Sequence, residues 1–405
     1  MSGCRARSSQ QTVRFWTFGR EGEATTELLR DFHVQHPDIR VEIQRLPWIS
    51  AHEKLLTAYA GETLPDICQL GNTWVPEFAA LDALEPLDDR AAASSVVQRA
   101  DYFDGLFDAN RIADRLYAIP WYADTRLLYY RTDLLQQAGF DSPPQRWDEW
   151  LTMMEAIKAR VGPDRYAVLL PLNEFEPLVV LALQQPSDLL RDGGRWGNFR
   201  SEDFQRTLEF YAQLFRRGLA PRMTNTQLSN VWDEFGNGLF TFYISGPWNI
   251  AEFRKRLPPQ LQDAWMTAPM PGPDGPGVST AGGAGLAIFR HSTNKDAAWK
   301  LVEYLSQPQT QQRFYATTGN IPPRRSTWTT PALVQSPYAR AYRTQLDRVR
   351  SPPKVPEWER IATEMRLASE RVVQGRSTVE EAAIALDATT DAILEKRRWM
   401  LDHRA

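Results

Sequence analysis

The first 75 residues alternate between short apolar stretches and amphipathic stretches. Residues 13–18 and 39–46 show the alternation of apolar and polar side chains that is typical of strands, and residues 23–35 show helical spacing. A second helix is predicted over 52–62, and a third strand over 66–70. Strand, helix and strand in succession predict a parallel pair with a right-handed crossover. The chain is therefore predicted to start as an α/β fold.

The predicted strands are followed by polar and aromatic residues that could bind a ligand. Ligands of open α/β sheets bind beyond the carboxyl ends of the strands. Those ends fall at 19–23, 45–48 and 71–74, and each contains charged, amide or tryptophan side chains. The candidate ligand residues in these three segments are Arg20, Glu23, Arg45, Trp48 and Asn72.

The stretch YAIPWYADTRLLYYR, at 117–131, places five aromatic residues around Asp124. Aromatic rings can stack on flat apolar faces, and a carboxylate can accept hydrogen bonds from hydroxyl groups. The alternative is that the rings pack in a core and that Asp124 pairs with Arg126. The pattern favours a site for a polar ligand, with Trp121, Tyr122 and Asp124 as candidates.

Composition narrows the class of protein. A chain of 405 residues predicts two or three domains, and its net charge of −3 without a basic stripe argues against binding nucleic acid. No apolar run reaches the length of a membrane span. The sequence lacks GxGxxG, Walker, GxSxG, HExxH and CxxC motifs, so no cofactor and no metal site are predicted.

The chain contains two cysteines, which do not form a disulfide framework. Cys68 lies in the apolar run ICQL and is predicted to be a buried hydrophobic residue. Ser2-Gly3-Cys4 resembles the end of a bacterial lipoprotein signal, in which the cysteine is acylated after cleavage. The alternative is that these residues belong to a flexible tail.

Several stretches resemble the solute-binding proteins of bacterial ABC sugar importers, in particular the maltose- and trehalose-binding type. The matching stretches include VRFWTFGREGE, FHVQHPDIRVEIQRLPW, LPDICQLGNTWVPEFAALDALEPLDD, FTFYISGPWNIAEF and STAGGAGLAIFRHSTNKDAAWKLVEYL, besides the aromatic stretch above. They follow the family's order between residues 13 and 400.

The resemblance implies a type II periplasmic-binding-protein fold. This α/β fold has two lobes, each a mixed and mostly parallel sheet flanked by helices, and a hinge joins them. Carried onto this sequence, lobe one comprises 11–122 and 288–340, and lobe two comprises 124–286 and 345–405. Residues 1–10 are expected to form a flexible tail.

The resemblance also implies a function. We expect a monomeric periplasmic protein that binds trehalose, maltose or a maltodextrin between its lobes and delivers it to a membrane permease and ATPase. Asp124 then matches a sugar-binding aspartate, and Trp248, beside Gly246, matches a stacking aromatic residue. Gly282 and Gly283 would offer backbone N–H groups, and Arg350 lies near an arginine of the relatives.

Two other functions remain open at this level. A glycoside hydrolase needs two carboxylates about 5–10 Å apart across the scissile bond, and sequence spacing does not exclude such a pair. A binding protein for a non-sugar solute, such as a polyamine or glycerol phosphate, requires a smaller change. Structural roles also remain open for single residues: Glu23 could stabilise a helix N-terminus, and Trp48 could belong to a core.

Overall fold

The computed structural model describes residues 10–403, which fold into two compact units. The first unit comprises Met1–Ala123 and Gly282–Thr330, and the second comprises Asp124–Ala281 and Pro331–Ala405. The described chain therefore passes from one unit to the other three times. Residues 282–286, which we predicted in lobe two, belong to the first unit, and residues 331–340, which we predicted in lobe one, belong to the second.

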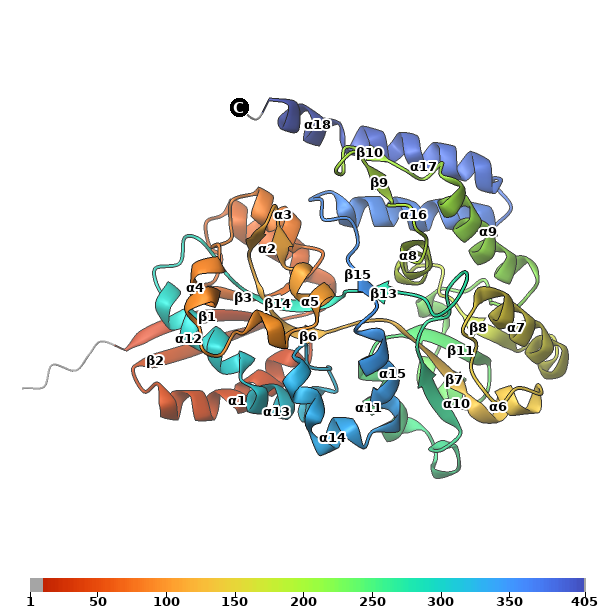
Figure 1. Ribbon diagram of the computed structural model, residues 1–405, viewed down its shortest axis with the longest axis horizontal. Coiled ribbons are helices and arrows are strands. Elements are labelled where there is room, and N and C mark those ends of the chain that lie inside the picture. The colour runs from red at the N-terminus through yellow and green to blue at the C-terminus, as the bar shows by residue number, and fades with distance from the viewer. Residues whose placement is uncertain (1–9, 404–405) are drawn as a thin grey trace, which may run out of the picture. The chain divides into compact units, whose positions relative to one another are not determined.

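The first unit contains, within the described residues, a five-stranded sheet in the order β2-β1-β3-β14-β6 (Figure 1). β1 pairs in parallel with β2 and β3, whereas β14 pairs antiparallel with both β3 and β6. The strands are β1 (Gln11–Phe18), β2 (Ile39–Leu46), β3 (Ile67–Gly71), β6 (Ile119–Ala123) and β14 (Gly283–Ile288), with a small hairpin of β4 (Arg111–Ile112) and β5 (Arg115–Leu116).

Helices cover both faces of this sheet because alternate side chains of each strand point to opposite faces. On β1, Phe15 packs in one hydrophobic cluster with α1, α12 and α13, and Phe18 packs in another with α2 and α3. Cys68 on β3 is fully buried, which confirms its prediction. The helices are α1 (Glu21–Gln35), α2 (Trp48–Ala60), α3 (Val75–Ala80), α4 (Asp88–Ala93), α5 (Asp104–Asp108), α12 (Lys295–Ser306) and α13 (Pro308–Thr318).

The second unit contains, within the described residues, a four-stranded sheet in the order β12-β7-β11-β8. β11 is parallel to β8, but β7 is antiparallel to both β11 and β12. Both sheets are thus mixed as expected: two of the four strand pairs described in the first sheet and one of the three described in the second are parallel. The strands are β7 (Leu127–Arg131), β8 (Tyr166–Leu169), β11 (Phe240–Ser245) and β12 (Trp265–Ala268), with the pairs β9 (Leu190–Arg191) and β10 (Trp196–Gly197), and β13 (Ser279–Thr280) and β15 (Val349–Arg350).

The second unit is rich in helices, and one large hydrophobic cluster joins them to its sheet. The apolar face of α9 packs on α8, α16 and α17 in this cluster (Figure 1). The helices are α6 (Thr132–Gln137), α7 (Trp147–Val161), α8 (Glu176–Leu183), α9 (Glu202–Arg216), α10 (Val231–Gly236), α11 (Trp248–Arg256), α14 (Pro331–Val334), α15 (Pro337–Gln345), α16 (Trp358–Val373), α17 (Val379–Ile393) and α18 (Glu395–Asp402).

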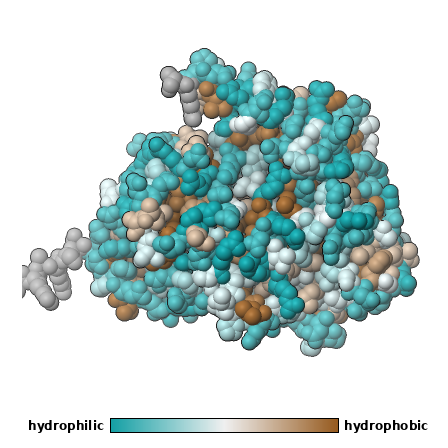
Figure 2. All heavy atoms as spheres, viewed as in Figure 1, coloured by the Kyte–Doolittle hydropathy of each residue, from teal (hydrophilic) through white to brown (hydrophobic). Residues whose placement is uncertain are grey.

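Hydrophilic residues occupy most of the surface of each unit that is visible in Figure 2. The large apolar side chains with high exposure include Ile49, beside Trp48 at the start of α2, and Trp399 on α18. Within the described residues, no helix combines the length and the apolar character that crossing a membrane requires.

Candidate functional site

Asp124 is the first residue of the second unit and directly follows β6. Arg126 lies beside it: its Nη2 is 3.7 Å from Asp124 Oδ2 and 3.9 Å from Glu176 Oε1, at the start of α8. The Arg126 backbone is fixed by Ser279, whose hydroxyl accepts from Arg126 N at 3.1 Å and donates to Arg126 O at 2.7 Å. We call Asp124, Arg126, Glu174, Glu176 and Trp248 the Asp124 cluster.

Trp248 completes the aromatic side of this cluster. It begins α11 directly after the turn that ends β11, and its ring lies 4.8 Å from the Arg126 guanidinium carbon. Gly246 allows this arrangement, because a Cβ added there would lie 2.0 Å from Trp248 Cζ3 and 2.6 Å from Asp124 Oδ1. The structure thus brings together three residues that we predicted in the site: Asp124, Gly246 and Trp248.

The Asp124 carboxylate is held in an environment that disfavours its charge. Burial raises its pKa, and Arg126 opposes this rise without cancelling it. The Oδ1 atom is buried and accepts no hydrogen bond from residues 10–403. A buried acceptor without a donor is costly, so this atom is suited to a ligand hydroxyl.

Glu174 adds a second carboxylate with a perturbed pKa. Burial raises the pKa of Glu174, while Arg126 and a hydrogen bond from Asn225 Nδ2 lower it. The net effect of the surrounding carboxylates on Arg126 is to raise its pKa, although burial acts in the other direction. Glu174 and Glu176 were not among the predicted site residues, because nothing in the segment NEFEP marks it as a strand end.

The turn that carries Trp248 is anchored by buried hydrogen bonds. The Tyr129 hydroxyl on β7 donates to Gly246 O at 2.7 Å and lies 2.7 Å from the Tyr342 hydroxyl on α15. Asn249 Nδ2 donates to Ser245 Oγ at 2.6 Å. These contacts fix the position of the indole ring before any ligand arrives.

The first unit has its own polar cluster, centred on Glu21 at the start of α1. Its Oε1 accepts from Asn320 Nδ2 at 2.8 Å, and the side chains of Trp48 and Tyr122 also hydrogen-bond to it. Burial raises the pKa of Glu21, and these hydrogen bonds act against the rise. Gln69 Nε2 in turn donates to the Tyr122 hydroxyl at 3.0 Å.

Trp48 is the partly exposed aromatic residue of this cluster, with 37% of its surface accessible. Its ring contacts Phe18 at 5.1 Å between centroids and Trp74 at 5.6 Å. Trp48 therefore packs against the core, which is one of its two predicted roles, and it still presents an apolar surface to solvent. Tyr122 and Trp48, both predicted site residues, meet at Glu21, which we had not selected.

The other candidates of the first unit lie in more open positions. Arg20, Glu23 and Arg45 are exposed, and the closest approach between Arg45 Nη1 and Glu23 Oε1 is 3.9 Å. Such exposed pairs add little stability. Asn72 N donates to Gly283 O at 3.1 Å, so these two predicted residues are adjacent, and Gly283 has a φ of 129° that favours glycine.

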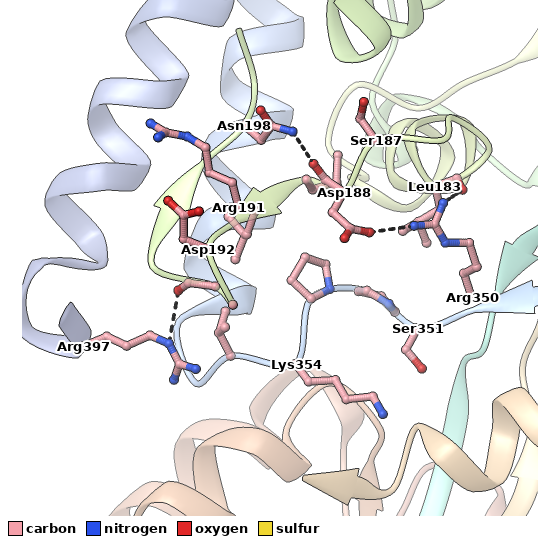
Figure 3. Close-up of a pocket in the computed structure, with 17 residues that line it drawn as sticks. Leu183, Ser187, Asp188, Arg191, Asp192, Asn198, Arg350, Ser351, Lys354 and Arg397 are labelled. Atoms are coloured by element: carbon pink, nitrogen blue, oxygen red, sulfur yellow. Dashed lines mark hydrogen bonds and ion pairs between the residues drawn. The ribbon is translucent and has the colours of Figure 1, made fainter. Parts of the chain in front are cut away.

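Two predicted site residues have clear structural roles instead. Trp121 is 1% exposed and stacks on Phe314 with centroids 4.5 Å apart, which places it in the core of the first unit. Arg350 uses Nη1 to donate to Leu183 O at 2.9 Å and to Gln185 O at 2.8 Å, at the C-terminal end of α8. The ring of Trp121 is thus packed within the core, and the guanidinium of Arg350 is bonded to the protein itself (Figure 3).

The chemistry of the two clusters is that of recognition. Each combines carboxylate acceptors, donors and an aromatic ring, which are the groups that bind a hydroxylated ligand with apolar faces. Within the described residues, histidine, cysteine and acidic side chains do not gather into a group able to hold a metal ion.

Comparison with known proteins identifies the class. The sequence model of the bacterial extracellular solute-binding proteins matches residues 27–341. The chain belongs to this family, and it is therefore a solute-binding protein with the expected type II fold, not a glycoside hydrolase.

Individual relatives are similar over nearly the whole chain. The structure of the sugar-binding protein MalE from Xanthomonas citri is 53% identical, covers 98% of this chain and 100% of its own, and has a TM-score of 0.94. Maltose-bound MalE3 from T. maritima is 25% identical, with coverages of 94% and 99% and a TM-score of 0.80. The diacetylchitobiose binding protein DasA from Streptomyces coelicolor is 23% identical over 368 residues, with coverages of 88% and 83%.

Proposed function

We propose that this protein is the substrate-binding component of an ABC sugar importer and that it binds an α-linked disaccharide, trehalose or maltose. The observation that carries the proposal is the buried Asp124 Oδ1, which lacks a donor within residues 10–403 and lies beside the ring of Trp248. A pyranose offers hydroxyl groups for the carboxylate and an apolar face for the indole. The similarity to MalE of Xanthomonas citri supports a sugar as the ligand.

We propose that residues of both units contact the same sugar. The candidates in the first unit are Glu21, Trp48, Asn72 and Tyr122, and those in the second unit are Asp124 and Trp248. A ligand that contacts both units would stabilise one arrangement of them over others, because its affinity for that arrangement is higher. The sugar-loaded form would then be recognised by the permease and the ATPase in the membrane.

The balance of charge argues against one alternative ligand. In the Asp124 cluster, the three carboxylates Asp124, Glu174 and Glu176 surround the single guanidinium of Arg126. This excess of negative charge disfavours glycerol phosphate. The guanidinium offsets only one of the three carboxylates, so charge alone does not disfavour a polyamine; the ring of Trp248 and the similarity to MalE of Xanthomonas citri favour a sugar. A neutral sugar satisfies the acceptors without adding a charge.

Location in the periplasm follows from the same proposal, since importer substrates are captured outside the cytoplasmic membrane. We propose that Cys4 carries a lipid anchor and that the protein acts as a monomer. Cys4 lies outside the described residues.

The test is calorimetric titration with trehalose, maltose, sucrose and a longer maltodextrin, followed by chromatography of the sugars. We expect saturable one-to-one binding of trehalose or maltose with a Kd on the order of 1 µM, equivalent to about −8 kcal/mol, and intact sugar afterwards. The absence of heat with all four sugars would remove the α-glucoside proposal, and hydrolysed sugar would overturn the function.

A further inference from the structure

Two tryptophans of the first unit mark the starts of the helices that follow neighbouring strands. Trp48 is the first residue of α2, after β2, and Trp74 is the residue just before α3, after β3. The helices α2 and α3 pack in one hydrophobic cluster on the same face of the sheet (Figure 1). The two indole rings are in contact, with centroids 5.6 Å apart and planes inclined at 60°. The position of Trp74 therefore limits where the ring of Trp48 can lie.

Trp74 is itself fixed by the groups around it. The fully buried ring of Phe18 lies 5.8 Å from the Trp74 ring between centroids. A Cβ at Gly71 would come within 3.2 Å of Trp74 Cδ2, so the indole rests directly on the end of β3. The ring of His52 lies 5.1 Å from Trp74 between centroids. His52 and Trp48 are four residues apart and share one face of α2, and Trp74 contacts both.

His52 is bound in turn to Glu77, in the first turn of α3. His52 Nε2 lies 2.6 Å from Glu77 Oε2, and the two side chains are only 26% and 25% exposed. A hydrogen bond to a carboxylate is about twice as strong as one between neutral groups, and partial burial protects it from screening by salt. The pair therefore ties α2 to α3 beside the ring of Trp74.

We propose that the His52–Glu77 pair positions Trp48 for the sugar and that it acts through Trp74. The inference rests on the proposed function, in which Trp48 contacts the sugar. The side chain of Glu21 accepts a hydrogen bond from Trp48, but a single bond leaves the half-exposed ring able to turn unless a neighbour blocks it. A ring that is fixed before the ligand arrives loses less conformational entropy on binding, which increases affinity. His52, Glu77 and Trp74 are thus positioning residues, and none of them has to contact the sugar.

The first experiment needs no ligand. Fluorine NMR of the whole protein labelled with fluorotryptophan reports on each indole, and Trp48→Phe and Trp74→Phe assign the two signals. We expect Glu77→Ala to shift or broaden the signals of Trp48 and Trp74. The signal of Trp121, which packs in a different hydrophobic cluster of the same unit, should stay in place. Glu53→Ala, a matched change of an exposed glutamate on α2, should move none of the three signals.

The second experiment is calorimetric titration of the same variants with trehalose and with maltose. Glu77→Ala should raise the Kd of the sugar that the parent protein binds by about threefold or more, and Glu77→Gln, which keeps an acceptor for His52, should raise it less. When Trp48 is already replaced in Trp48→Ala, Glu77→Ala should cause no further rise, because the ring that the pair positions is gone. A merely structural role would give the same loss in both backgrounds.

Three results would overturn the proposal: an unmoved Trp48 signal in Glu77→Ala, an undiminished further loss in the Trp48→Ala background, or an equal effect of Glu53→Ala. A thermal unfolding scan shows whether each variant is folded, and Glu77→Gln carries the same comparisons if Glu77→Ala does not fold. If the parent protein binds neither sugar while Glu77→Ala still moves the Trp48 signal, the proposed function fails and the positioning of Trp48 stands.

Discussion

The replacement Asp124→Asn tests the proposed site most sharply, because it preserves the shape of the side chain and removes its charge. The side chain is 26% exposed, and its buried Oδ1 is available for one hydrogen bond from a sugar hydroxyl. A hydrogen bond to a charged group contributes about 1.5–3 kcal/mol. The asparagine oxygen can still accept a neutral hydrogen bond, which contributes about 0.5–1.5 kcal/mol, so the loss is about 1–1.5 kcal/mol and the Kd of the sugar should rise about fivefold to tenfold.

The same replacement should leave the empty protein at least as stable. Burial raises the pKa of Asp124 in the folded state above its value in the unfolded chain, so the ionised form is disfavoured by folding. The stability that this group contributes is present below the unfolded pKa, near 4, and is lost as the pH rises through the folded pKa. At neutral pH, the asparagine should therefore give an equal or larger free energy of unfolding.

Two measurements decide the matter: calorimetric titration with the sugar, and urea unfolding without it, both at pH 7. Asp141→Asn is the matched control, because Asp141 is an exposed aspartate of the same unit. An unchanged Kd in Asp124→Asn would show that the charge of Asp124 does not contribute to sugar binding. A large loss of stability would show that Asp124 is a structural residue and would refute the reasoning.

Three further predictions concern neighbouring features. Gly246→Ala places a Cβ 2.0 Å from Trp248, so the ring must move and titration should show sugar affinity at least tenfold weaker, with Gly275→Ala as the control in open space. Arg350→Gln leaves the carbonyls that end α8 without their donor and should lower the free energy of unfolding in urea by about 1.5–3 kcal/mol, while sugar affinity persists. Burial raises the pKa of Glu21, so the affinity for the sugar should begin to fall on acidification at a pH above the ordinary carboxylate range. Calorimetric titration at several pH values measures this profile. Glu21→Gln should flatten it, and an unaltered profile would contradict the role of Glu21.

The fold of the N-terminal segment was predictable, because its local apolar patterns and the crossover rule for parallel strands indicate the same arrangement. The first three strands and the first two helices form where the apolar periodicity placed them, and their parallel pairing follows from the crossover rule. The antiparallel insertion of β14 between β3 and β6 was not predictable in this way, because it joins segments more than 150 residues apart. The lobe boundaries near 282–286 were misplaced for the same reason.

The site was predictable to the level of segments, and individual side chains required the helix register. We predicted a helix over 23–35 and chose Glu23, whereas α1 begins at Glu21. With the helix starting there, Glu21 lies on the same buried face as Thr25, Leu28 and Phe32. Glu23 lies on the exposed face. The periodicity of the apolar residues, extended by one turn, would have indicated Glu21.

Trp121 shows why the role of some side chains could not be predicted from local sequence patterns. An aromatic residue next to a candidate acid is equally consistent with stacking on a ligand and with packing in a core, and Phe314, its actual partner, is distant in sequence. Arg350 is similar, since its acceptors at the end of α8 are set by tertiary contacts. Burial decides between the two roles, and burial depends on segments that meet only in the folded chain.

The position of β14 also constrains the order in which the protein can be made. This strand lies between β3 and β6 in the sheet of the first unit, yet it comprises residues 283–288. A nascent chain that ends before it has β3 and β6 with unpaired edges, which favour association with other chains. The N-terminal 123 residues are therefore not a separable domain, and the first unit can close only after more than two thirds of the polypeptide has been synthesised.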